Sequence, residues 1–330
     1  MTALAPTLQA FFTDRLARQR HASEHTIAAY RDTIRMLLTF AAARGGVAPS
    51  RLDIDHLDAA TISAFLDHLE HDRGNTVRTR NARLAAIHSL FRFAALQHPE
   101  HAGTISRVLA IPPKRGEQAL VTYLTDPEID ALLAAPDWRT WTGRRDHALI
   151  QVGIQTGLRI SELTGLTVSD VSLGTGAHVA CHGKGRKDRI TPLTAQSVTV
   201  LRAWIPQIPA GPSTPVFPSR TGSRLSRDAV EHRLKLHSLA AADTCPSIRS
   251  KTVTAHVLRH TTAMRLLHSG VDVSVIALWL GHESIETTRI YLFADLDLKQ
   301  RALARTRPIG RAKTGRYQPP DTLIAWLEGL

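Results

Sequence analysis

Three side chains able to carry positive charge share one face of an otherwise apolar segment, AHVLRHTTAMRLL, residues 255–267. They are His256, Arg259 and His260, which stand at i, i+3 and i+4 and so project from the same side of a helix. Because like charges at this spacing repel each other, the arrangement predicts an anion in front of that face. The alternative for His260 is a structural role, in which its ring bonds a backbone carbonyl.

A metal site is the competing interpretation of the same segment, since two histidines at i and i+4 are the spacing of a helical zinc pair. Val257 stands where a metalloprotease of the HExxH type carries its general-base glutamate. Arg259, between the two histidines, disfavours a cation. We therefore expect no metal here.

Three other segments carry residues of complementary chemistry. TGLRISELTGL places Arg159 and Glu162 one helical turn apart. GKGRKDR places Lys184 at a tight turn between two expected strands. LGHESIETTRIY carries His282 after an expected helix and Tyr291 nine residues later. Together with the face at 256–260, these segments supply cations, a carboxylate and a phenol.

If the anion is a phosphodiester, breaking it by transfer to the protein needs a nucleophile and a proton for the leaving oxygen. Tyr291 is the candidate nucleophile, and with an ordinary phenol pKa of about 10 it needs help to lose its proton. His256 is the candidate that accepts this proton or positions the phenol. Lys184 is the candidate general acid for the departing 5′ oxygen.

The phosphate itself needs stabilisation of the charge that builds up in the transition state. Arg159 and Arg259 remain charged and present forked donors suited to the two non-bridging oxygens. There they would stabilise a pentacoordinate transition state. His282 would add a further hydrogen bond to the phosphate.

This set of residues resembles the tyrosine recombinase family, also called phage-type integrases. The family pattern of Arg, Lys, His-x-x-Arg, His and Tyr matches Arg159, Lys184, His256, Arg259, His282 and Tyr291. The spacings are 3 residues from His256 to Arg259, 23 to His282 and 9 to Tyr291. One motif alone is weak evidence, whereas all six residues in order are specific. The anion expected at the 256–260 face would then be a DNA phosphate.

The resemblance implies a 3′-phosphotyrosyl link at Tyr291, release of a 5′ hydroxyl and strand exchange through a Holliday junction. It implies no cofactor, neither ATP nor a metal. The implied partners are double-stranded DNA and further copies of the chain, which form a homo-tetramer on two synapsed sites. Away from DNA, the chain would be a monomer or associate weakly. Accessory proteins or companion recombinases are further candidate partners. Glu162 matches the acidic position beside the first arginine and takes a supporting, orienting role. A role in a mobile element, by integration or transposition, is the biological setting we expect.

Each residue also has a simpler interpretation. Arg159 and Glu162 could form a surface ion pair, and Tyr291 could be a core aromatic. The basic residues of the expected turn could form only a solvated surface; they are Lys184, Arg186, Lys187 and Arg189. Of these, Arg186 and Lys187 are candidate DNA contacts. For the whole protein, the alternatives are a type IB topoisomerase-like enzyme, a catalytically inactive DNA-binding protein and a metal-dependent hydrolase, which chelator sensitivity would reveal.

Composition agrees with a nucleic-acid partner. The 330 residues include 41 Lys and Arg against 29 Asp and Glu, which gives a net charge of +12 with histidine neutral. Cys181 and Cys245 are the two cysteines, so we expect no disulfide framework and a reducing compartment. The N-terminus lacks the pattern of a signal peptide, and no stretch is apolar enough to span a bilayer. We expect a cytoplasmic, nucleoid-associated protein without a membrane role.

The expected fold is mainly α with a small β-sheet (α+β). Apolar stripes predict four helices near residues 8–16, 27–41, 62–69 and 84–91, with Ser23 as an N-cap. Basic residues on the other faces of the fourth helix include the candidate DNA contacts Arg78, Arg80 and Arg83. Residues 98–116 have poor periodicity and predict a linker. Later helices are expected at 144–155, 194–205, 227–242, 256–269 and 273–280, and short strands flank the GKGRKDR turn.

We therefore expect an N-terminal helical core-binding domain, SAM-like by resemblance, at residues 1–105. A linker at 106–120 and a mixed α/β catalytic domain at 121–305 follow. The remaining residues, 306–330, are expected to form a basic tail and a C-terminal amphipathic helix. This helix would pack either on its own catalytic domain or on a neighbouring protomer.

Overall fold

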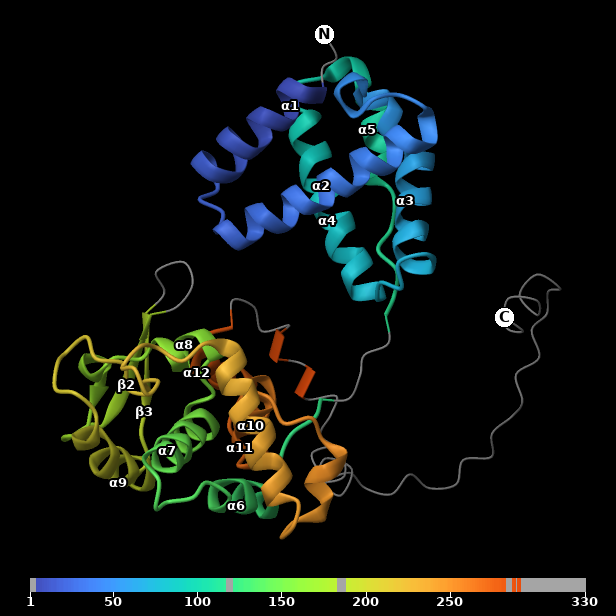
Figure 1. Ribbon diagram of the computed structural model, residues 1–330. Coiled ribbons are helices and arrows are strands. Elements are labelled where there is room, and N and C mark those ends of the chain that lie inside the picture. Colours follow the sequence, from blue (N-terminus) through green and yellow to red (C-terminus); the bar gives the residue numbers. More distant parts are fainter. Residues whose placement is uncertain (1–3, 117–120, 183–187, 283–286, 289, 292–330) are drawn as a thin grey trace, which may run out of the picture. The chain divides into compact units, whose positions relative to one another are not determined.

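The chain folds as two units, residues 1–118 and 119–330. The computed structural model describes residues 4–116, 121–182, 188–282, 287–288 and 290–291 (Figure 1). Lys184, Arg186, Lys187 and the expected tail and C-terminal helix therefore lie outside the described residues. Among the described residues, no helix is long and apolar enough to cross a bilayer.

The first unit is helical, as expected. Its elements are α1 (Leu4–Ala10), which continues as a π-helix (Phe11–Gln19), α2 (Glu24–Gly45), α3 (Ala59–His71), α4 (Val77–Ala94) and α5 (Ala102–Leu109). The predicted cap at Ser23 is confirmed, since its side chain accepts a hydrogen bond from the Thr26 backbone N–H. The apolar stripes of α2, α3 and α4 meet in one core that includes Leu37, Phe65 and Ile87.

The helix α5 corrects the prediction of a linker across residues 98–116. Ile105 and Val108 point into the core of the first unit and are 2% and 0% exposed. Their stripe spans barely two turns and stands among proline, glycine and charged residues, which hid its periodicity. The boundaries of the functional domains remain predictions.

In its described residues, the second unit combines helices with a small sheet. Its helices are α6 (Asp126–Ala134), α7 (Trp141–Thr156), α8 (Ile160–Gly165), α9 (Ala195–Trp204), α10 (Arg227–Ala241), α11 (Ala255–His268) and α12 (Val273–Leu280). Its antiparallel sheet has the order β1 (Val171–Ser172), β2 (His178–His182), β3 (Asp188–Pro192). The predicted fold class, mainly helical with a small sheet, is confirmed.

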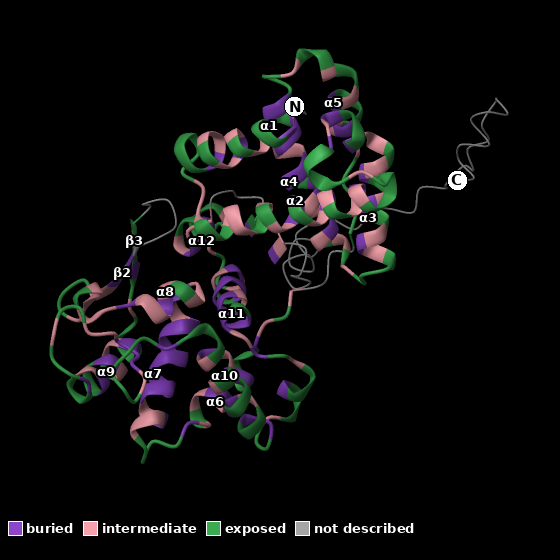
Figure 2. Cartoon of the chain, turned by 45° about the horizontal axis from the view of Figure 1, so that its top comes forward, coloured by how far each residue is buried: buried purple, intermediate pink, exposed green. Residues whose placement is uncertain are grey.

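Helix α7 is the central element of this unit. It packs against α9 on one side and α11 on the other, with the strands beside α9 and with α10 beside α11 (Figure 1). Both α7 and α11 are largely buried (Figure 2). This arrangement brings the C-terminal end of α7, where the TGLR segment begins, next to the face of α11 that carries Arg259.

Gly157 ends α7 in the left-handed conformation, with φ +64°, as the sequence predicted. A Cβ at this position would lie 2.6 Å from Leu280 Cδ2 and 3.1 Å from Thr262 Cβ. We therefore expect Gly157→Ala to lose about 1–2 kcal/mol to backbone strain and about 1–3 kcal/mol more to overpacking. Chemical denaturation of the purified protein measures the sum.

Gly176 provides the matched control for this substitution. It has φ +71°, but nothing lies within 4 Å of a Cβ placed there. Gly176→Ala should thus show the backbone loss alone, about 1–2 kcal/mol. Equal losses in the two variants would contradict the packing argument at Gly157.

Candidate active site

Arg259 is buried in α11, with 4% of its surface exposed, and binds the ends of two other helices. Its Nη1 donates to the Gly157 carbonyl and its Nη2 to the Leu280 carbonyl, both at 2.7 Å. These carbonyls close α7 and α12, where helix dipoles favour a cation. Burial and the charge of Arg159 lower the pKa of Arg259 to about 10, so it is still a cation at neutral pH.

Arg159 precedes α8 and lies partly in solvent, with 40% of its side chain exposed. Its backbone N–H and its Nη1 donate to Glu162 at 2.8 and 2.9 Å, and its Nη2 donates to the Gly281 carbonyl at 2.6 Å. The Glu162 side chain is only 6% exposed. The alternative of a surface ion pair is therefore wrong, because the carboxylate is an internal anchor for Arg159.

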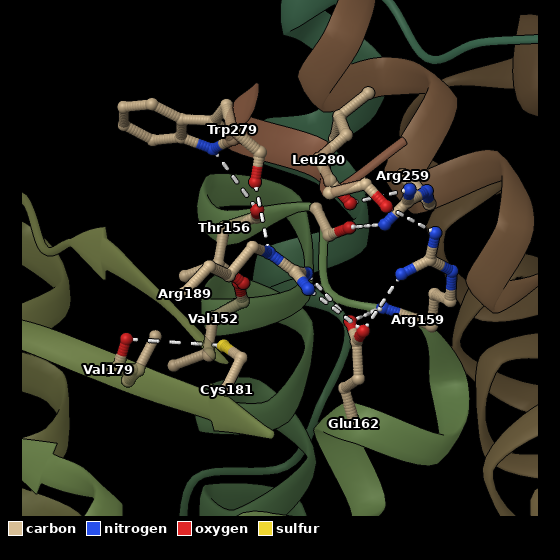
Figure 3. A network of polar contacts seen from close by, with 12 residues as sticks. Val152, Thr156, Arg159, Glu162, Val179, Cys181, Arg189, Arg259, Trp279 and Leu280 are labelled. Atoms are coloured by element: carbon tan, nitrogen blue, oxygen red, sulfur yellow. Dashed lines mark hydrogen bonds and ion pairs between the residues drawn. The ribbon is translucent and has the colours of Figure 1, made fainter. Parts of the chain in front are cut away.

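Arg189 is a member of this network that the sequence did not identify. From β3 its Nη1 and Nη2 donate to the two Glu162 oxygens at 2.9 and 2.7 Å, and its Nε donates to the Trp279 carbonyl at 3.2 Å (Figure 3). Its side chain is 12% exposed, so assigning it to a solvated basic turn was wrong. Burial works to raise the pKa of Glu162, but the bonds from Arg189 and Arg159 outweigh it and lower that pKa to about 2.

Tyr291 is buried, at 2% exposure, in a cluster with Met264, Ile276 and Leu280. Its hydroxyl lies 3.0 Å from Nδ1 of His260. Burial raises the pKa of the phenol to about 12. The tyrosine thus has the surroundings of a core aromatic and, at its hydroxyl, the polar neighbour that a nucleophile needs.

The ring of His260 bonds the phenol. The structure records this contact in place of the backbone carbonyl considered from the sequence. Burial, with the positive potential of His256 and Arg259, lowers the pKa of His260 to about 4, so its ring is neutral at pH 7. A neutral ring that carries its proton on Nε2 can accept a hydrogen bond from the phenol at Nδ1. The two histidine rings are adjacent, with centroids 4.1 Å apart.

His282 follows Gly281, which ends α12 with φ +65°. Nδ1 of His282 lies 2.7 Å from Oγ1 of Thr288, and its ring stacks on Tyr291 with centroids 6.5 Å apart. Burial and the charge of Arg259 lower the pKa of His282 to about 4. The neutral ring of His282 is oriented by its contact with Thr288.

Four of the six predicted residues line one cavity of about 450 Å³. They are Arg159, His256, Arg259 and His282. They come from α8, α11 and the segment after α12, and two are permanent cations, so an anion is the ligand the cavity favours. Within the described part of the chain, no group of three or more His, Cys, Asp or Glu could hold a metal ion.

The candidate DNA contacts in the first unit differ in their exposure. Arg78 is exposed and Arg83 is half-buried, with its Nη1 donating to Thr33 at 3.3 Å. Arg80 is only 6% exposed and donates to Asn81 at 3.1 Å. The prediction that Arg80 lies on a DNA-facing surface is therefore corrected, because the side chain lies on the inner side of α4.

The low pKa of Glu162 predicts a pH dependence of stability. A carboxylate whose pKa falls from about 4.3 in the unfolded chain to about 2 stabilises the fold above pH 4.3 and loses that stabilisation as the pH falls toward 2. We expect the stability difference between wild type and Glu162→Gln to be up to about 3 kcal/mol near neutrality and to shrink below pH 4.3. Thermal unfolding from pH 7 to pH 3 measures it, and a difference independent of pH would contradict the assignment.

Comparison with known sequences agrees with this geometry. The profile of the Phage integrase family matches residues 122–296, and that of the phage integrase N-terminal SAM-like domain matches residues 10–98. The chain is 54% identical over 328 residues to the putative integrase/recombinase y4rC of Sinorhizobium fredii, covering 99% of this chain and 98% of the relative. It is 33% identical over 304 residues to the tyrosine recombinase XerC of Pelobacter propionicus, covering 90% and 93%.

Solved structures share the fold. The Tn1549 transposon integrase in complex with a circular intermediate DNA gives a TM-score of 0.68 at 17% identity, covering 91% of this chain and 99% of that chain. The XerH site-specific recombinase bound to a palindromic difH substrate gives 0.66 at 22% identity, covering 87% and 81%. With the matches along nearly the whole sequence, the chain belongs to the phage integrase family and is a tyrosine recombinase, a DNA strand transferase.

Proposed function

We propose that this protein is a site-specific recombinase that cleaves and rejoins DNA through a phosphotyrosyl intermediate at Tyr291. One observation carries the proposal: Arg159, His256, Arg259 and His282 line a single cavity. Its charge suits one phosphate of a DNA strand.

In the cleavage step, the phenol oxygen attacks the phosphorus while its proton passes to Nδ1 of His260, 3.0 Å away. The phosphorus–O5′ bond breaks, and Lys184 supplies the proton that the 5′ oxygen takes up. This role for Lys184 is carried over from the sequence. We assign to His260 the proton transfer first expected of His256, because Nδ1 of His260 lies within hydrogen-bond distance of the phenol oxygen.

The arginines stabilise the transition state. Arg159 presents the more exposed guanidinium and Arg259 the more buried one, so the two non-bridging oxygens meet charged donors fixed by protein carbonyls. His256 and His282, which also line the cavity, add donors. Attack by the 5′ hydroxyl of a partner strand reverses the step, and the phosphoester is exchanged. The reaction therefore consumes no ATP and requires no metal.

The assembly and setting that we propose follow the resemblance. Four protomers would hold two DNA sites while the strands are exchanged through a Holliday junction. In the absence of DNA the protomers would associate weakly or not at all. The matched integrase of transposon Tn1549 favours a mobile-element role for this chain, with integration or transposition as the outcome. The protein would act on DNA in the cytoplasm, at the nucleoid, alone or with accessory proteins or companion recombinases.

A suicide substrate tests the chemistry. A duplex carrying the ends of the encoding element and nicked beside the cleavage point is incubated with the protein in EDTA, and the products are separated on a denaturing gel. We expect a covalent protein–DNA adduct. When two sites are supplied, we also expect DNA products in which strands of the two sites are joined (joint molecules). An adduct without joint molecules would indicate a type IB topoisomerase-like enzyme. Binding without an adduct would indicate an inactive DNA-binding protein, and an adduct lost in EDTA would indicate a metal-dependent enzyme.

A further inference from the structure

Arg189 connects three segments that are far apart in the sequence. Its guanidinium binds both oxygens of Glu162, in α8, and the carbonyl of Trp279, in the last turn of α12. Figure 3 shows the side chain reaching from β3 between these two elements. In the sheet register Arg189 lies opposite Cys181, which is buried, so the strand directs this arginine to the protein side.

The backbone at Gly281 is shaped around the same guanidinium. A Cβ at Gly281 would lie 2.9 Å from Nη1 of Arg189, and the glycine has φ +65°. The Gly281 carbonyl accepts from Nη2 of Arg159, and the next residue is His282. Arg189 thus contacts the segment that orients two residues of the cavity.

Charge is the second consequence of this contact. Glu162 accepts two bonds from Arg159 and two from Arg189. With both arginines present, the trio carries a net charge of +1, and Arg159 has a charge left for a phosphate. Without Arg189, the pair of Arg159 and Glu162 would be neutral, and the carboxylate would compete with the phosphate for the Arg159 donors.

We propose that Arg189 is a positioning residue for strand cleavage, which holds Glu162 and the Trp279–Gly281 backbone so that Arg159 faces the phosphate with its charge uncompensated. The inference rests on the proposed function. Arg189 is not among the residues that line the cavity in the described part of the chain, so it acts on the cavity through its neighbours.

The test uses Arg189→Met and Arg189→Lys in the full-length protein. At saturating suicide substrate we expect Arg189→Met to slow adduct formation about 10–100-fold, with the Kd for DNA changed less than about 3-fold. Arg189→Lys keeps the charge but loses the forked geometry, so it should recover part of the rate. Arg139→Met is the matched control, since Arg139 also forms a two-bond pair with a carboxylate, Asp137, but is 91% exposed.

Two further measurements separate positioning from a general loss of structure. The double variant Arg189→Met with Glu162→Gln should be no slower than the slower single variant, because both act on Arg159. A substrate with a 5′-bridging sulfur, whose leaving group needs no proton, should not restore the rate. Multiplied losses in the double variant, or full recovery with the sulfur substrate, would overturn the proposal.

Failure of this inference differs from failure of the proposed function. If wild type forms the adduct and Arg189→Met forms it equally fast, only the inference is wrong. If wild type forms no adduct, the proposed function fails and the role of Arg189 in cleavage fails with it, and amide hydrogen exchange then tests whether Arg189 holds the Trp279–Gly281 backbone. Loss of Arg189 should speed exchange at the His282 amide, which donates to the Ala277 carbonyl at 2.9 Å. Unchanged exchange at the His282 amide would contradict the claim that Arg189 holds this backbone.

Discussion

Tyr291→Phe is expected to abolish the covalent protein–DNA adduct, with a loss on the order of 10⁴-fold or more in its rate of formation. The substitution removes the only oxygen that can form the phosphotyrosyl bond in the proposed step. The ring remains, so the cluster with Met264, Ile276 and Leu280 keeps its packing. One hydrogen bond is lost, to His260, and stability should change by about 1 kcal/mol. The denaturing gel of the suicide-substrate assay measures the rate.

Tyr30→Phe is the matched control for this variant. Tyr30 lies in the first unit, where its ring stacks on Phe11 with centroids 6.3 Å apart. The Tyr30→Phe variant should form the adduct at the wild-type rate. Both Tyr30→Phe and Tyr291→Phe should bind the DNA with the wild-type affinity. An adduct that persists in Tyr291→Phe would show that another residue is the nucleophile, and the roles of His260 and Lys184 would then need reassignment.

The helices of the protein were predictable because their signals are local. Ser23 and Asp58 cap α2 and α3 with their own side chains, and Gly157 ends α7 in the conformation that glycine adopts without strain. The order of the catalytic motifs was likewise visible in the sequence. The convergence of Arg159, His256, Arg259 and His282 on one cavity is a property of the packing of α8, α11 and α12.

Arg189 was missed for a physical reason. On β3 its neighbour Ile190 is 67% exposed, so an apolar residue lies outside while the charged one faces Glu162. Alternation of hydrophobicity therefore suggests the opposite orientation of the strand. The useful signal is the acidic residue Glu162, whose second arginine partner lies 27 residues away.

His260 and Arg80 show the same limit. Helical spacing places His256 and His260 on one face but does not say which ring meets Tyr291, because that depends on how the chain returns after α12. Arg80 stands among arginines on α4, yet it is buried while Arg78 is exposed. Basic composition indicates a DNA partner for the whole chain, and only the fold decides which arginines remain available.

Arg259→Gln is expected to slow adduct formation at saturating DNA by about 10²–10³-fold, the second largest effect. Glutamine can keep one carbonyl contact but has no charge to set against the phosphate. It leaves the Gly157 or the Leu280 carbonyl without its donor, which should lower stability by about 1–3 kcal/mol. Adduct rates are compared at a temperature at which both proteins are folded, as shown by their thermal unfolding.

Arg145→Gln separates the two effects, because Arg145 is equally buried, at 4% exposure, and also donates to a carbonyl, that of Pro218. It lies near the N-terminal end of α7, whereas the cavity adjoins the C-terminal end. Its loss should therefore destabilise the protein at least as much while the adduct rate of the folded fraction stays within about 3-fold of wild type. If Arg259→Gln behaved like Arg145→Gln, Arg259 would be a structural anchor for α7 and α12, and the phosphate would have to depend on Arg159 alone.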